Sequence, residues 1–141
     1  MEARISLITL GVADVAVARG FYERLGFTAS PASQAEVAFF QVGGLALALY
    51  GRAALAADAG VDAGSPAFSA VTLAQNLRSE REVDEAYAHA LAAGAKPSQP
   101  PRRADWGGYV AYFADPDGHL WELAWNPSFP LDGDGNLHLP A

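Results

Sequence analysis

One carboxylate, Glu122, stands out because it interrupts an apolar run, Leu120 to Trp125, that has the pattern of a β-strand. Side chains alternate between the two faces of a strand, so Glu122 shares a face with Leu120 and Ala124. A carboxylate among apolar side chains costs free energy unless a metal ion, a basic group or water compensates its charge. Glu122 is therefore the first candidate for a functional residue, as a metal ligand, a general base or the partner of a cationic ligand.

The histidines offer little further chemistry. His89, His119 and His138 have no spacing typical of a metal site, and no Ser-His-Asp arrangement can be argued from the sequence. His119 follows Asp115-Pro116-Asp117-Gly118, a tight-turn pattern, and is interpreted as a turn residue. The chain has no cysteine, which excludes thiolate ligands, thiol nucleophiles and disulfides.

Aromatic side chains are the candidates for pocket walls. Tyr50 ends a predicted strand, and Trp106 sits beside two glycines in a predicted loop. Large rings at these positions would suit a planar or cationic ligand through stacking and cation–π contacts. Trp121 and Trp125 have the opposite strand parity to Glu122, so we expect them to pack in the core.

Composition bounds the class of protein. The chain has 141 residues, of which 51% are hydrophobic, enough for one domain with its own core. A formal net charge of −7 argues against nucleic acid and anionic membranes as partners, because both need a basic surface. The sequence shows neither a signal-peptide pattern nor an apolar run of about 18 residues, so we expect a soluble, cytoplasmic protein.

The first half of the chain predicts a strand, a helix, a short strand and a hairpin. Asp14 is a suitable N-cap and Gly26 a suitable C-terminal residue for the helix, and Gly43-Gly44 predicts the hairpin turn. The predicted strands are Ile5 to Val12, Phe27 to Ala29, Val37 to Val42 and Leu45 to Tyr50.

The second half repeats this order. A strand is predicted at Phe68 to Asn76, and a capping box at Ser79 to Glu82 opens a helix that ends at Gly94. A loop from Pro97 to Gly108 then leads into the strand Tyr109 to Ala114 and the hairpin that carries Glu122.

The repeat has a period of about 65 residues, in the order of elements more than in identity. We therefore predict one α+β domain over residues 1–141, built from two modules, 4–50 and 68–126. Residues 51–67 are rich in Gly, Ala and Asp and read as a linker with one helical turn at 53–57. Residues 127–141 are predicted to be an irregular tail.

Several short motifs together resemble the vicinal oxygen chelate superfamily, over about residues 4 to 126. This group includes glyoxalase I, bleomycin-resistance proteins, fosfomycin-resistance enzymes, methylmalonyl-CoA epimerase and extradiol dioxygenases. The resemblance implies two βαβββ modules that form a half-open barrel, a homodimer, and a divalent metal in the barrel that substrate oxygens chelate. The motifs that carry it are Gly11-Val12-Ala13-Asp14, Phe21-Tyr22-Glu23-Arg24-Leu25-Gly26-Phe27, Asp115-Pro116-Asp117-Gly118-His119 and Trp121-Glu122.

The metal ligands that the resemblance implies are mostly missing. The ligand of the last strand falls on Glu122, whereas that of the first strand falls on Leu7. A metal site needs three or more protein ligands in fixed geometry, so we name no cofactor with certainty. If Zn, Ni, Mn or Fe binds, Glu122 is the candidate ligand and Gln75 the polar alternative. The other implied positions carry Ala46, Ala48 or Tyr50 in the first hairpin, and Ala70 or Thr72 in the second module.

The residues and the resemblance lead to two interpretations. The first is a dimeric protein that binds a small molecule in the barrel cavity without a complete metal site, as bleomycin-resistance proteins do. The alternative is a metal-dependent lyase or isomerase resembling glyoxalase I, with Glu122 as ligand or base. A third role, in structure or interaction only, would leave the cavity without a ligand. Besides Glu122, we expect the ligand to contact Leu7, Thr9, Ala48, Tyr50, Asn76, Trp106 and Tyr109.

Overall fold

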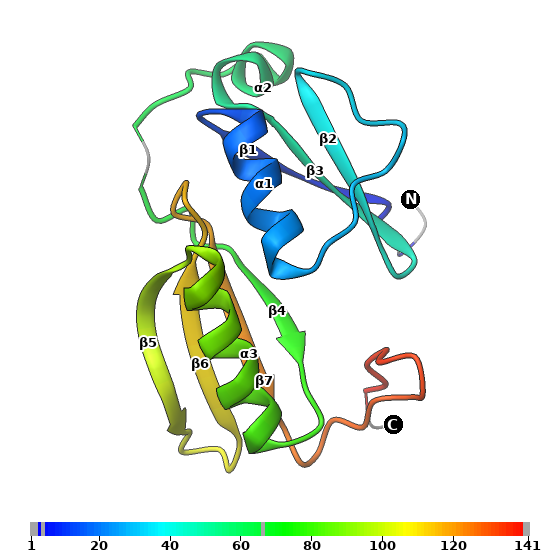
Figure 1. Cartoon of the computed structure of the whole chain (residues 1–141), viewed down its shortest axis with the longest axis vertical. Helices are drawn as coiled ribbons and strands as arrows, with labels where there is room; N and C mark the ends of the chain where they lie inside the picture. Colours follow the sequence, from blue (N-terminus) through cyan, green and yellow to red (C-terminus); the bar gives the residue numbers. More distant parts are fainter. Residues whose placement is uncertain (1–2, 4, 66, 140–141) are drawn as a thin grey trace. The chain divides into compact units, whose positions relative to one another are not determined.

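The two predicted modules form two separate units, Met1–Ala67 and Phe68–Ala141, in a computed structural model of the chain. The structure describes residues 3, 5–65 and 67–139. Each unit has its own β-sheet and its own helix along one face of that sheet (Figure 1). The predicted α+β fold of two modules is therefore confirmed. The half-open barrel concerns how the two sheets meet, and it stays a prediction.

The first unit has a three-stranded sheet in the order β1-β3-β2. β1 runs parallel to β3, and β2 runs antiparallel to it. The short strand predicted at 27–29 is reduced to a single antiparallel bridge between Ala29 and Phe40. The elements of this unit are β1 (Leu7–Val12), α1 (Val15–Leu25), β2 (Val37–Val42), β3 (Leu45–Gly51) and α2 (Arg52–Ala59).

The two faces of the first sheet differ in what covers them. α1 packs on one face, where Phe21, Tyr22 and Phe40 are buried and the rings of Tyr22 and Phe40 lie 5.9 Å apart. α2 lies against one end of the other face. A Cβ added to Gly11 would come within 3.3 Å of Leu55 in α2, so the absence of a side chain there allows the close approach.

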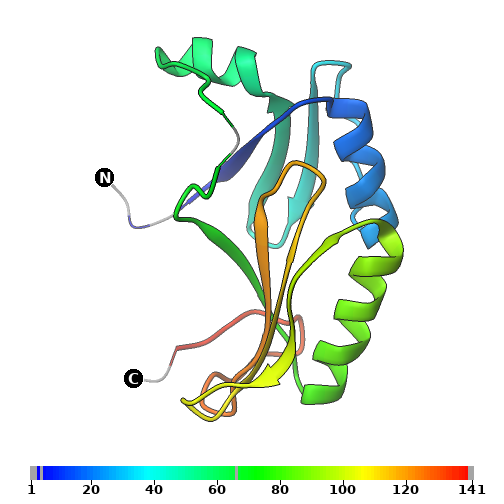
Figure 2. The same ribbon diagram turned by 90° about the vertical axis from the view of Figure 1, so that its left-hand side faces the viewer.

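The second unit has a four-stranded sheet in the order β4-β7-β6-β5, with α3 along one face (Figure 2). β4 is parallel to β7, and the remaining neighbours are antiparallel. β4 and β5 are therefore the edge strands. The elements are β4 (Thr72–Asn76), α3 (Glu80–Ala93), β5 (Lys96–Arg103), β6 (Tyr109–Ala114) and β7 (Leu120–Trp125).

The predicted helix caps are confirmed. The Asp14 carboxylate accepts a hydrogen bond from the Val17 amide at 3.0 Å, and the Ser79 hydroxyl accepts one from the Glu82 amide at 3.1 Å. The Glu82 side chain in turn accepts from the Arg78 amide at 2.9 Å, one residue before the position of an ideal capping box. The bonds to Asp14 and Ser79 satisfy helix N–H groups that have no partner within the helix.

The turn between β6 and β7 forms as predicted, and a buried carboxylate holds it together. The Asp115 side chain has no exposed surface. It accepts hydrogen bonds from the Asp117 amide at 3.0 Å and the His119 amide at 2.8 Å. Its second oxygen lies 2.9 Å from Nδ1 of His119, which confirms His119 as a turn residue. Gly118 has φ of 92°, as the turn requires.

The predicted loop from Pro97 to Gly108 is wrong over its first half. Residues 96–103 form the edge strand β5, paired with β6 and irregular at two points between Pro97 and Arg102. Proline cannot donate a ladder hydrogen bond, so it is tolerated in a sheet only at an edge or a bulge. β5 meets both conditions, which the local sequence did not reveal.

Several other boundaries differ from the prediction. β1 begins at Leu7 instead of Ile5, and β3 runs to Gly51 instead of Tyr50. β4 begins at Thr72 instead of Phe68, because Ala70 has φ of 58°, a conformation that interrupts an extended strand. The single helical turn predicted at 53–57 extends to the eight-residue helix α2, which ends at Gly60.

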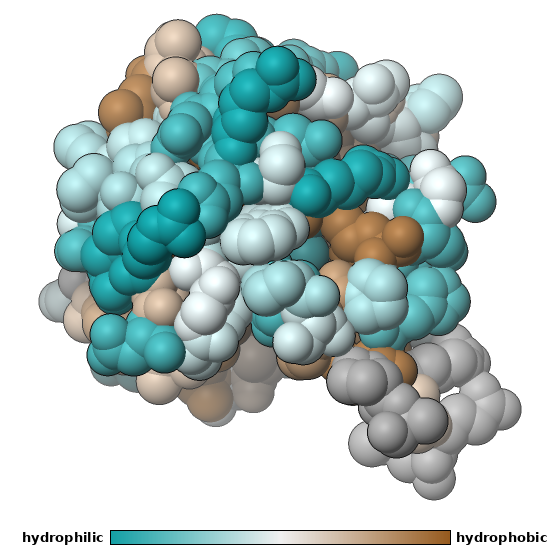
Figure 3. Space-filling model, turned by 90° about the horizontal axis from the view of Figure 1, so that it is seen from below, coloured by the Kyte–Doolittle hydropathy of each residue, from teal (hydrophilic) through white to brown (hydrophobic). Residues whose placement is uncertain are grey.

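Many side chains on the face shown in Figure 3 are hydrophilic, and hydrophobic residues reach the surface there at several places. Within the described part of the chain, every helix is too short or too polar to cross a membrane.

Candidate ligand-binding site

Glu122 lies on the face of the second sheet that is opposite α3. The ladder pairs it with Ala74 of β4 on one side and with Tyr112 of β6 on the other. Trp121 lies on the helix-facing side, where its ring stacks on Phe113 with centroids 6.3 Å apart. The predicted alternation of the strand is therefore confirmed, and it separates the carboxylate from the core.

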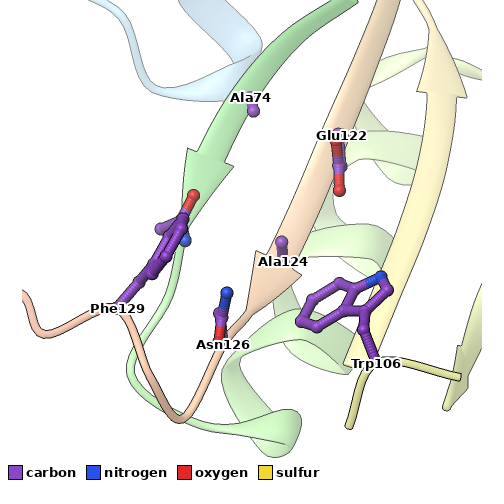
Figure 4. Close-up of a pocket in the computed structure, with 7 residues that line it drawn as sticks. Ala74, Trp106, Glu122, Ala124, Asn126 and Phe129 are labelled. Atoms are coloured by element: carbon purple, nitrogen blue, oxygen red, sulfur yellow. The ribbon is translucent and has the colours of Figure 1, made fainter. Parts of the chain in front are cut away.

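A pocket of about 200 Å³ opens in front of Glu122. Trp106 and Phe129 stand on opposite sides of it, with Ala124 and Asn126 between them (Figure 4). The two aromatic rings form the walls, while alanines along the strands leave the space open. The complete lining is Ala74, Asn76, Trp106, Glu122, Ala124, Asn126 and Phe129.

The position of Trp106 depends on Gly108. The hairpin between β5 and β6 closes through hydrogen bonds from the Ala104 amide to the Gly108 carbonyl and from the Gly107 amide to the Ala104 carbonyl. A Cβ added to Gly108 would lie 1.9 and 2.0 Å from two ring atoms of Trp106. The indole therefore lies directly across Gly108, with 55% of the residue exposed.

Tyr112 is the polar neighbour of Glu122. Burial raises the pKa of Tyr112 above its ordinary value, and the negative charge of Glu122 and a hydrogen bond to its carboxylate raise it further. The positive charge of Arg102 on β5 acts in the opposite direction on this pKa. The carboxylate thus has a phenol partner on one side and the open pocket on the other.

Asn126 and Phe129 belong to the segment that follows β7. The Phe129 amide donates to the Asn126 carbonyl at 3.1 Å, and the Ser128 amide donates to the Asn126 side chain at 2.9 Å. This turn directs the chain back toward the sheet, so that Phe129 reaches the pocket. Sequence reasoning did not identify these two residues as part of the site, although Asn126 continues the strand parity of Glu122 and Ala124.

The predicted ligand-contacting residues of the second unit divide into two groups. Asn76 and Trp106 line the pocket together with Glu122. Tyr109 lies elsewhere, because its hydroxyl donates to Asp84 of α3 at 2.9 Å, which raises its pKa. Gln75 borders a second pocket instead.

The predicted residues of the first unit lie together on its sheet. Leu7, Thr9, Ala48 and Tyr50 share the face opposite α1. Tyr50 is hydrogen-bonded to Asp58 of α2, and this bond is the main reason that its pKa is raised. Their contact with a ligand stays a prediction.

The side chains around Glu122 do not fit a metal ion. Its strand neighbour on β4 is Ala74, two pairs further along than Thr72, and a methyl group cannot be a ligand. Within residues 3, 5–65 and 67–139, no three His, Asp or Glu side chains gather at one place where they could hold a metal. The donor set therefore falls short of the three protein ligands that a stable site needs.

Comparison with known proteins agrees with the fold. Residues 4–123 match the family model described as Glyoxalase/Bleomycin resistance protein/Dioxygenase superfamily. A glyoxalase-related enzyme from Fulvimarina pelagi has 34% identity and a TM-score of 0.90, covering 99% of this chain and 100% of its own. A glyoxalase/bleomycin resistance protein/dioxygenase from Nocardioides has 30% identity and a TM-score of 0.75, with 89% and 84% covered.

A more distant structure, a lactoylglutathione lyase from Agrobacterium tumefaciens, has 22% identity and a TM-score of 0.69. It covers 89% of this chain and 96% of its own, and at this identity it shows the fold alone. No protein with a curated description matches the chain.

Proposed function

The chain belongs to the Glyoxalase/Bleomycin resistance protein/Dioxygenase superfamily, and from this premise we propose that it binds a planar, cationic small molecule in the Glu122 pocket. The observation that carries the proposal is a single carboxylate in the lining of a pocket with two aromatic walls. Glu122 supplies the negative charge, while Trp106 and Phe129 supply ring faces on either side. Binding of this kind needs affinity only, so it does not require a metal with three protein ligands.

The chemistry of the pocket favours a cation over an anion. An aromatic face attracts a cation, and the attraction is worth about 0.5–1 kcal/mol at exposed sites and more where water is excluded. A ligand cation beside the Glu122 carboxylate also gains a charge attraction, about 1 kcal/mol at about 4 Å in water and more where the dielectric is lower. The net charge of −7 acts in the same direction over longer distances. An anionic ligand would meet the Glu122 carboxylate with nothing in the pocket lining to neutralise it.

Binding of benzyltrimethylammonium, followed by calorimetry, tests the proposal. We expect saturable binding to the wild type and affinity about tenfold lower for Glu122→Gln, because the attraction between the two charges is lost while the shape is kept. Toluenesulfonate, a planar anion, should not bind. A Glu85→Gln variant is the matched control, since Glu85 is exposed on α3 and pairs with Arg81 away from the pocket. Equal affinity of the wild type and Glu122→Gln would overturn the assignment of Glu122.

A second candidate function is a lyase or isomerase that uses a metal. It is favoured by the position of Glu122 on the last strand and by the fold shared with the Agrobacterium lactoylglutathione lyase. It requires ligands from outside the group of residues around Glu122. Calorimetric titration with Ni²⁺, Zn²⁺ or Mn²⁺ separates the two functions. Stoichiometric binding that Glu122→Ala abolishes would favour the enzyme.

The family resemblance also supports a homodimer as part of this proposal. Sedimentation equilibrium of the full chain would measure its mass directly. A monomer at all concentrations would contradict the dimer and leave the pocket assignment unchanged.

A further inference from the structure

Two adjacent arginines, Arg102 and Arg103, end the edge strand β5. Successive side chains of a strand point to opposite faces of its sheet, so the two guanidinium groups belong to different faces. Arg103 faces α3, because two of its guanidinium nitrogens lie 2.9 and 3.1 Å from the carboxylate of Glu80 on that helix. Arg102 therefore belongs to the face opposite α3, which is also the face of Glu122.

The strand register brings Arg102 to the same region of that face as Glu122. Arg102 lies opposite Val110 of β6. Two residues further along β6, Tyr112 lies opposite Glu122 of β7. Opposed residues of an antiparallel pair share a face, and neighbouring strands are about 4.8 Å apart. The backbones at Glu122 and Arg102 are therefore about 10 Å apart across the sheet and about 7 Å apart along it.

Tyr112 lies between these two charges. Burial and the negative charge of Glu122 raise the pKa of its phenol, whereas the positive charge of Arg102 lowers it, so both charges act on one hydroxyl group. Tyr112 is half-buried and Arg102 is exposed. A ligand that extends from Glu122 across Tyr112 therefore approaches a positive charge that solvent can reach.

The side chain of Arg102 is available for a ligand. The other basic side chains of the second unit each have an acceptor, either a backbone carbonyl or a carboxylate; they are Arg78, Arg81, Lys96 and Arg103. In the part of the chain that the structure describes, the Arg102 guanidinium has neither kind of acceptor. A guanidinium group presents its donors as a rigid fork that matches a carboxylate, so Arg102 suits an anionic group.

The size of the Glu122 pocket indicates that its ligand extends beyond it. The volume of about 200 Å³ is below the range of about 300–1,000 Å³ that is typical of small-molecule sites. A ligand of ordinary size that is held beside Glu122 therefore projects over the neighbouring surface of the sheet. Tyr112 and Arg102 belong to that surface.

We infer that the ligand of the Glu122 pocket is a zwitterion, with its planar cation beside Glu122 and a carboxylate bound by Arg102 across Tyr112. A zwitterion satisfies both charges of this sheet face, whereas a simple cation satisfies only one. The inference rests on the proposed function, because it names the class of ligand for the same site.

The test compares the affinities of two probes of the same shape by calorimetry on the full chain. The probes are (4-carboxybenzyl)trimethylammonium and its carboxamide, and only the first has a negative charge at the far end of the ring. We expect the acid to bind the wild type about fivefold more tightly than the amide, the upper end for an exposed ion pair. The difference should shrink as NaCl is raised from about 0.05 M to about 0.5 M, because salt screens exposed charges.

Two variants at neighbouring positions assign the difference to one guanidinium group. Arg102→Gln should make the affinities of the two probes equal and should change that of the amide by less than about twofold. Arg103→Gln is the matched control, since it removes the same charge from the next residue, which pairs with α3. It should keep the preference for the acid.

The outcomes separate this inference from the proposed function. If the acid binds the wild type no more tightly than the amide, or if its advantage persists in Arg102→Gln, the zwitterion is overturned and the proposed function stands. Failure of both probes to bind the wild type overturns both.

Discussion

Tyr112 and Glu122 lie directly opposite each other in the ladder between β6 and β7, and the negative charge of the carboxylate adds to burial in raising the pKa of the phenol. The interaction fixes one side of the only carboxylate in the pocket lining. It also connects the ionisation of a tyrosine with the charge that we assign to ligand binding, since a phenolate beside Glu122 would repel it.

Stability should fall at alkaline pH. The folded-state pKa values of Tyr50, Tyr109 and Tyr112 are raised above 10.0, so between the ordinary and the raised values the unfolded chain has already lost these protons. Stability from these groups is complete below pH 10 and is lost as pH rises through the folded values. Urea unfolding at pH values of about 8, 10 and 11, which lie below, at and above the ordinary tyrosine pKa of about 10, should show the decrease in the free energy of unfolding.

Tyr112→Phe should reduce that alkaline decrease. The variant removes one late-titrating phenol, which absorbance at 295 nm detects as a smaller final rise in the pH titration. An unchanged titration curve in Tyr112→Phe would contradict the raised pKa of Tyr112.

Asp115→Ala should destabilise the second unit. Asp115 is fully buried and accepts from two half-buried backbone amides, which would lose their partner. We expect the free energy of unfolding in urea to fall by about 2 kcal/mol, within the range for a buried polar group left unsatisfied. Asp105→Ala, at an exposed position in the β5–β6 hairpin, should change it by less than about 0.5 kcal/mol.

Gly108→Ala should displace the Trp106 ring. The new methyl group would overlap two ring atoms and lie 2.7 Å from the Trp125 carbonyl, so the indole has to leave its position. We expect a red shift in tryptophan emission and weaker binding of benzyltrimethylammonium. If the variant acts through the ring, Gly108→Ala should weaken binding no further once Trp106→Ala is present.

Gly44→Ala is the control for that experiment. A Cβ at Gly44 in the first unit would meet no atom within 4 Å. Its emission and binding should match the wild type. Unchanged emission in Gly108→Ala as well would show that Gly108 does not position the ring.

The turn at Asp132 should persist into acid. Hydrogen bonds from His138 and Asn136 hold the pKa of Asp132 well below the ordinary carboxyl value of 3.8, so its contribution is present above that value and is lost only as pH falls through the lower folded value. The amide signals of Asp134 and Asn136 in NMR spectra should therefore change only in strong acid. In His138→Ala they should change at higher pH; identical profiles would contradict the role of His138.

The sequence was informative wherever the signal is local. N-caps at Asp14 and Ser79 and the turn after Asp115 depend on bonds within a few residues, and all three formed as predicted. Strand parity likewise placed Glu122 on the face away from the helix, because alternation is a property of the strand itself.

The features that were not predicted depend on contacts between residues that are far apart in the sequence. β5 is a strand because it finds β6 as a partner, although its prolines disfavour a sheet. Phe129 reaches the pocket because the segment after β7 folds back, and one of its anchors joins Arg78 to Asp132, 54 residues away. Neither contact leaves a pattern in the neighbouring residues.

The prolines of β5 affect how copies of the chain associate with one another. An edge strand with free N–H groups invites a strand from another chain to pair with it, which is a route to aggregation. Pro97, Pro100 and Pro101 have no N–H group to donate, and the irregular pairing interrupts the regular spacing that an incoming strand would need. Both features make this edge of the sheet a poorer template for a strand from another chain.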